Sequence, residues 1–226
     1  MPFVTVPRKS ETKVEEVYHP EIKWRVDDAP KEGGGSRDKE ALTVVIEQAP
    51  RNRTINYRHS FYAGDKYTQY HLQIPWTYYV ARVNKAGVIL LSGMFFANEE
   101  LKAVDQKGLC AAPLPNNDYG RDKGLGVCLW KAGASFGKNP SDAAIKVHEY
   151  IWTSDFNPGV NYYDSGRPEA IQARSWPGSL KKWEELTFKK EAITWVPVKN
   201  RLTGNLCETL EGAFEWLSSE NDYLYQ

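Results

Sequence analysis

Residues 77–96 read TYYVARVNKAGVILLSGMFF, and this stretch decides the fold class. Two runs rich in β-branched and aromatic residues, Thr77–Val83 and Val88–Phe96, flank the segment Asn84–Gly87. Such runs are typical of strands, and a glycine at position 87 can take the positive φ that a tight turn needs. The stretch therefore predicts an antiparallel hairpin.

Two more strands are predicted upstream, at Ala41–Glu47 and Tyr70–Ile74, because both segments are rich in β-branched or aromatic residues. With the hairpin they make a four-stranded antiparallel meander. Further along the chain the apolar residues recur at helical spacing. Strands followed by helices are typical of an α+β domain.

Three helices are predicted in the second half. Asn139 or Ser141 is the expected N-cap of a helix that runs to Trp152, since both side chains can accept a hydrogen bond from the first turn. A short helix is predicted at 180–186, and a last one directly after Asn205, which opens a capping box.

The chain divides into two parts at about residue 40. Residues 1–40 are polar and interrupted by prolines, so we expect an irregular N-terminal arm. Residues 41–226 are predicted to form a single α+β domain, with a C-terminal helical extension from about residue 158.

Charge and composition exclude several classes of function. Lys and Arg together number 29, as do Asp and Glu, so the electrostatic attraction that drives nucleic-acid binding is absent. The longest apolar stretch, Gly87–Ala97, is too short to cross a bilayer as a helix, and no signal peptide is recognisable. We therefore expect a cytoplasmic protein with no membrane partner.

The metal-ligating residue types are scattered. The chain has 3 Cys and 4 His, with no CxxC pair and no HExxH spacing. The sequence predicts neither a disulfide framework nor a metal site, and nothing in it requires a cofactor.

The chemistry is expected in Ala111–Trp130, which reads AAPLPNNDYGRDKGLGVCLW. This loop holds one cysteine, Cys128, together with Asn116. A thiolate can attack a carbonyl carbon, and a neutral amide can donate a hydrogen bond to the oxyanion that forms, so the pair suits acyl transfer. From composition alone, a cysteine in a loop is more often a small buried apolar residue, and both interpretations stay open.

The strings Pro115-Asn116 and Gly126-Val127-Cys128-Leu129 resemble the active-site signature of ubiquitin-conjugating enzymes. The resemblance is closer to divergent prokaryotic members of that superfamily, the family D type and the PRTRC-system protein B. Those proteins also have an aromatic-rich helix that ends in a Ser-x-Phe element, which corresponds here to Ser154-Asp155-Phe156. The resemblance covers about half of the chain, from Ala41 to Phe156.

The resemblance implies both a fold and a mechanism. In this superfamily a four-stranded antiparallel meander precedes the motif and a helix follows it. A ubiquitin-like protein would arrive from an activating enzyme as a thioester on Cys128 and pass to an amine. Asn116 would stabilise the oxyanion, and Asp118 and Asp122 are candidates to orient the acceptor amine.

The chain departs from the family pattern at three places. Leu114 stands where the eukaryotic enzymes have histidine, Asn117–Gly124 is an apparent insertion, and Trp130 replaces a common aspartate. Two alternatives therefore remain: a catalytically inactive relative that serves as an interaction scaffold, or an unrelated structural protein of a phage or mobile element.

Overall fold

The computed structural model describes the backbone of residues 4–7, 14–17, 21–27, 41–58, 67–112, 114, 117–118, 126–127, 137–156, 180–195, 198–199 and 206–219. Within these residues the chain is an α+β protein with an antiparallel sheet, as the sequence predicts.

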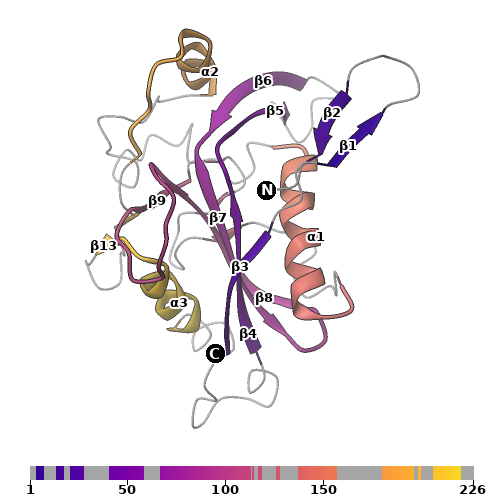
Figure 1. The fold of residues 1–226 in the computed structure, drawn as a ribbon, viewed down its shortest axis with the longest axis vertical. Coiled ribbons are helices and arrows are strands. Elements are labelled where there is room, and N and C mark those ends of the chain that lie inside the picture. The colour runs from indigo at the N-terminus through magenta and orange to yellow at the C-terminus, as the bar shows by residue number, and fades with distance from the viewer. Residues whose placement is uncertain are drawn as a thin grey trace.

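A five-stranded antiparallel sheet forms the centre of the molecule, with the order β3-β4-β7-β8-β9 (Figure 1). Its strands are β3 (Glu21–Asp27), β4 (Ala41–Gln48), β7 (Trp76–Asn84), β8 (Ile89–Ala97) and β9 (Leu109–Ala111). The predicted turn joins β7 to β8: the Gly87 N–H donates to the Asn84 carbonyl oxygen at 3.0 Å, and Gly87 has a φ of 75°.

A second ladder extends the β4–β7 pair. It joins β5 (Arg51–Arg58) to β6 (Tyr67–Ile74), and its register continues that of β4 and β7 without a slip. Pro50 and Pro75 are therefore opposite each other at the break between the ladders. Neither proline has an N–H to donate, so the hydrogen-bond ladder is interrupted there, and the long hairpin curls (Figure 1).

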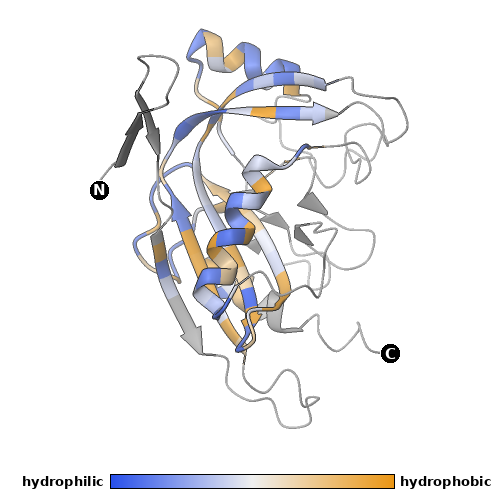
Figure 2. Ribbon diagram, turned by 90° about the vertical axis from the view of Figure 1, so that its right-hand side faces the viewer, coloured by the Kyte–Doolittle hydropathy of each residue, from blue (hydrophilic) through white to orange (hydrophobic). Residues whose placement is uncertain are grey.

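One face of the sheet is covered by α1 (Pro140–Thr153), which lies across the strands in Figure 2. The Asn139 side chain accepts a hydrogen bond from the Asp142 N–H at 3.0 Å, which confirms one of the two predicted caps. The buried residues of α1, which include Ala144, Val147 and Ile151, pack in one cluster with alternate residues of β4 and β7.

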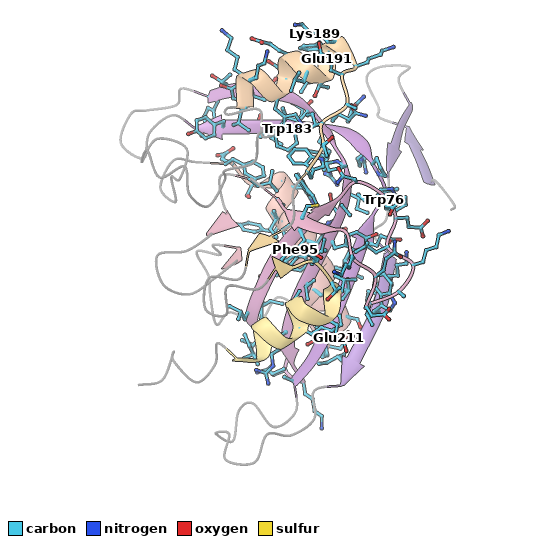
Figure 3. The ribbon with its side chains drawn as sticks, turned by 90° about the vertical axis from the view of Figure 1, so that its left-hand side faces the viewer. Trp76, Phe95, Trp183, Lys189, Glu191 and Glu211 are labelled. Carbon is cyan, nitrogen blue, oxygen red and sulfur yellow. The ribbon has the colours of Figure 1, made fainter. Side chains whose placement is uncertain are left out.

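The other face of the sheet packs against α3 (Leu210–Ser219). A separate cluster forms between that helix and the sheet, and it contains Val45, Tyr78, Val80, Phe95, Leu210 and Ala213. Phe95 is labelled just above α3 in Figure 3. Successive residues of a strand point to opposite faces, so β4 and β7 contribute to both clusters. The sheet is buried on both sides.

Helix α2 (Leu180–Lys189) covers the free edge of β6. The His71 N–H donates to Glu184 Oε1 at 2.7 Å and the Gln73 N–H donates to Thr187 Oγ1 at 3.0 Å. Trp183 Nε1 completes the contact by donating to the Gln73 carbonyl oxygen at 3.2 Å. Trp183 lies beneath α2 in Figure 3, whereas Lys189 is on its outer side. Side chains of α2 thus replace a neighbouring strand.

Three predictions from the sequence are corrected. The segment Tyr70–Ile74, expected as one of four strands in a meander, lies in β6, which pairs with β5 and leads directly into β7, so it is not a separate strand of the central sheet. The N-terminal arm, expected to be irregular, contains β1 (Val4–Pro7), β2 (Val14–Val17) and β3, and β3 pairs with β4 in the main sheet. The last helix begins at Leu210 rather than directly after residue 205. The segment before it contains β13 (Leu206–Cys207), which pairs with β12 (Val198–Lys199), so Cys207 lies in a strand.

Candidate functional site

The predicted catalytic residues are described only in part. Asn116, Asp122 and Cys128 lie outside the described residues. Asp118 is described as part of the backbone of β10 (Asn117–Asp118). The structure therefore describes only the segments that are next to these residues in the chain.

A short hairpin joins the two halves of the predicted motif. Strand β10 pairs antiparallel with β11 (Gly126–Val127), with Asn117 opposite Val127 and Asp118 opposite Gly126. Asn116 directly precedes the first of these pairs in the sequence, and Cys128 directly follows it. Strand β11 also lies close to β8, so the hairpin is attached to the central sheet.

The segment that leads to this hairpin is anchored in the core. Strand β9 pairs with β8 at the sheet edge, and beyond it Ala112 and Leu114 are both buried. The Leu114 N–H donates to the Ala112 carbonyl oxygen at 2.7 Å, which closes a tight local turn. Leu114 is 2% exposed and belongs to the cluster packed against α1. Leu114 is thus an apolar anchor in this chain.

Cys110, which precedes the loop, is unsuited to nucleophilic chemistry. Its thiol donates to the Gly108 carbonyl oxygen at 3.2 Å and is buried beside Asn98. Burial, with a smaller contribution from Glu208, raises the pKa of the Cys110 thiol to about 12. Since the thiolate is the reactive form, Cys110 is a packing residue.

After the loop, the chain packs closely against the first turn of α1 at Gly137. At Gly137 a Cβ atom would lie 2.5 Å from the backbone nitrogen of Ala143, so only glycine fits against the first turn of α1. At the other end of α1, Ser154 caps the helix, and the Phe156 N–H donates to the Asn56 carbonyl oxygen at 2.8 Å. Phe156 is fully buried, so the Ser-x-Phe element fixes the end of α1 to β5.

A polar cluster is buried where α1 meets the end of β4 and the start of β5. His148 Nε2 accepts a hydrogen bond from Trp152 Nε1 at 3.1 Å, and the Arg53 guanidinium lies 4.4 Å from the centre of the Trp152 ring. Arg53 Nη2 donates to Gln48 Oε1 at 2.6 Å. We call these four residues the Arg53 cluster. His148 is 2% exposed, so it is a packed histidine.

Arg53 is not among the site residues predicted from the sequence, because its strand, NRTINYR, has the composition of a basic aromatic patch. Within it, Arg53, Ile55 and Tyr57 alternate with Asn52, Thr54 and Asn56. Ile55 is 1% exposed, whereas Asn52 and Thr54 are exposed, as expected for a strand with one buried face. That period of two in the sequence was the signal that could have placed Arg53 on the same face of the strand as the buried Ile55.

Among the described residues no group of His, Cys, Asp and Glu side chains could hold a metal ion. No described helix is both long enough and apolar enough to cross a bilayer. Comparisons with protein-family models, curated proteins and solved structures found no match to this chain. The function is therefore argued from the chain's own residues.

Proposed function

We propose that the chain is a ubiquitin-conjugating-enzyme-like protein, of the prokaryotic type named above, that carries a ubiquitin-like protein as a thioester on Cys128. The β10–β11 hairpin is the observation that supports this proposal most strongly. It pairs Asn117 with Val127, the residues next to Asn116 and Cys128 in the chain. If the ladder continues by one residue, the amide and the thiol come to neighbouring positions, as transfer chemistry requires.

The apparent insertion is compatible with this arrangement. Its first two residues form β10, and the others lie in the connection between Asp118 and Gly126, which are themselves paired. Added length between paired positions extends the connection and leaves the register of the flanking residues unchanged. A change in the length of residues 119–125 therefore leaves the pairing of Asp118 with Gly126 unchanged.

Two substitution steps make up the proposed reaction. The Cys128 thiolate attacks the carbonyl carbon of the thioester on the activating enzyme, a new carbon–sulfur bond forms, and the enzyme's sulfur leaves as a thiolate. A neutral amine then attacks the same carbon, Cys128 leaves as a thiolate, and the surplus amine proton passes to solvent. Asn116 donates a hydrogen bond to the oxyanion formed in each step, and Asp118 and Asp122 orient the amine.

The arrangement of the fold also supports the proposal. The strands of the sheet are antiparallel neighbours in chain order once β5 and β6 are counted as extensions of β4 and β7. The motif follows the sheet and α1 follows the motif, which is the order expected of a ubiquitin-conjugating fold. The C-terminal extension differs from that order, since α2 pairs with the edge of β6.

The proposal names a ubiquitin-like protein and an activating enzyme as partners, and it needs no cofactor, metal, nucleic acid or membrane. It includes a cytoplasmic location, because a catalytic thiol stays reduced there. A phage or another mobile element is the proposed source of such a protein.

A thioester-loading assay tests this function. The full chain is mixed with the activating enzyme and the ubiquitin-like protein encoded beside it, and the products are separated on a non-reducing gel. We expect a band shift that thiol reductant removes. Cys128→Ala abolishes the shift, and Cys128→Ser converts it to a reductant-resistant ester. Cys110→Ala is the matched control and keeps the shift, since the Cys110 thiol is buried.

Two results would contradict the proposal. One is a shift that persists in Cys128→Ala, which would place the modifier on another residue. The other is the absence of any shift when the activating enzyme is demonstrably charged. That outcome would favour the inactive scaffold.

A further inference from the structure

The Arg53 cluster contains three polar atoms that have no hydrogen-bond partner among the residues that the structure describes. They are Gln48 Nε2, Arg53 Nε and His148 Nδ1, and each is buried from solvent. Gln48 and His148 are 0% and 2% exposed, so water at the surface cannot satisfy them. A buried polar atom without a partner is destabilising, so three in one cluster need an explanation.

All three atoms are hydrogen-bond donors. Gln48 Oε1 accepts a hydrogen bond from Arg53, so the atom of the Gln48 amide that has no described partner is the NH₂ nitrogen, Nε2. Trp152 Nε1 can only donate, so the His148 Nε2 that it contacts carries no proton. Burial, together with the positive charge of Arg53, lowers the pKa of His148 to about 3, so the ring is neutral and its proton is on Nδ1.

The cluster also carries an unbalanced positive charge. The described partners of Arg53 are the Gln48 amide and the Trp152 ring, both uncharged. No described acidic residue forms an ion pair with the Arg53 guanidinium. Taking a cation out of water without a counter-charge is unfavourable, and a partner of opposite charge offsets this penalty.

We propose that the Arg53 cluster binds a small oxyanion, a carboxylate or phosphate group, between α1 and the bend of the long hairpin. An oxyanion accepts several hydrogen bonds and carries the negative charge that the cluster lacks. A water molecule would supply acceptors without the charge. The bound group would connect β4, β5 and α1 beside Pro50, where the ladder is interrupted.

This site is independent of thioester chemistry, so the experiment needs only the full chain. Thermal unfolding is measured in sodium phosphate, sodium acetate and sodium chloride at equal ionic strength. A ligand that binds the folded state raises Tm in a saturable way. We expect phosphate or acetate to raise Tm above its value in chloride, and the anion with the larger shift identifies the bound group.

Variants distinguish a specific site from a general charge effect. Arg53→Met removes the guanidinium and is expected to abolish the oxyanion-specific shift. Lys85→Met removes one positive charge in the turn at the opposite end of β7 and is expected to keep it. Equal Tm values in the three salts, or a shift that survives in Arg53→Met, would overturn the proposal. So would loss of the shift in Lys85→Met.

A second measurement covers the case in which Arg53→Met does not fold. The ¹⁵N–¹H resonance of His148 Nδ1 is followed in the wild-type chain during titration with phosphate and with acetate. A saturable change, absent in chloride, is expected when the N–H gains an acceptor. An unchanged resonance in both titrations would overturn the proposal.

Discussion

The side chain of Asn98 makes two hydrogen bonds to the backbone of Trp195. Asn98 Oδ1 accepts from the Trp195 N–H at 2.9 Å, and Asn98 Nδ2 donates to the Trp195 carbonyl oxygen at 3.1 Å. The Trp195 ring packs against Phe96 and Trp183, with ring centres 4.9 and 5.0 Å away. The segment after α2 is thus attached to the end of β8 and belongs to the same core.

Replacing Asn98 should loosen this attachment. Asn98→Ala leaves two backbone groups of Trp195 without their partners, and since Asn98 is exposed, water replaces part of the loss. We expect a decrease of roughly 1–2 kcal/mol in the free energy of unfolding, measured by urea denaturation with tryptophan fluorescence. Asn98→Asp keeps the acceptor and should lose less. Equal stability of wild type and Asn98→Ala would contradict this role.

Gly137 should be intolerant of any side chain. In Gly137→Ala the new Cβ would lie 2.8 Å from Ala143 Cα as well as 2.5 Å from its nitrogen, and neither backbone atom can move without disturbing α1. We expect a loss of about 1–3 kcal/mol in thermal or urea unfolding. Lys138→Ala is the matched control, since the Lys138 side chain is exposed. The hydrogen bond from its backbone N–H to the Asp142 carboxylate is retained in this variant. If Gly137→Ala were as stable as this control, the close approach of Gly137 to the Ala143 backbone would be absent.

Stability should decrease in acid because of His148. The pKa of its buried ring is about 3 in the folded chain, against 6.5 for a free histidine. Between these values the unfolded chain binds the additional proton. The contribution of His148 is therefore fully present above pH 6.5 and is lost as the pH falls toward 3. The slope from this one group is at most about 1.4 kcal/mol per pH unit.

His148→Gln removes the titrating group and should flatten the dependence of unfolding free energy on pH over this range. The described titratable groups that face His148 are Arg53 of β5 and Tyr79 of β7, and both stay unchanged in the variant. His148→Phe should flatten the profile to the same extent, although it lacks the hydrogen bond to Trp152. Profiles of equal slope in wild type and both variants would refute the assignment.

Local patterns made the hairpin of β7 and β8 and the start of α1 predictable. The turn depends on the side chain and carbonyl of Asn84 and on the positive φ of Gly87, and all three are features of neighbouring residues. The cap of α1 is likewise a contact between Asn139 and Asp142. Turns and helix caps that depend on a few neighbouring residues can be predicted from a single sequence.

Long-range contacts were not predictable in the same way. Strand β3 lies in the sheet because it pairs with β4, and β13 precedes α3 because it pairs with β12. The true cap of α3 is Thr209, whose Oγ1 accepts from the Gly212 N–H at 3.0 Å. The Arg53 cluster exists because α1 reaches β5. The period of two in β5 places Arg53 on the same face as Ile55, but no local pattern identifies its partner on α1.

The central proposal is that Asn116 and Cys128, which are next in the chain to the paired residues Asn117 and Val127, act together in thioester transfer. Its most direct test is the single-turnover discharge of a preformed thioester to free lysine, in Asn116→Ala and in the matched control Asn117→Ala. We predict normal loading of both variants and a discharge about 10²–10³ times slower in Asn116→Ala alone, the usual effect of losing one oxyanion donor. Equal discharge rates for wild type and both variants would contradict the account.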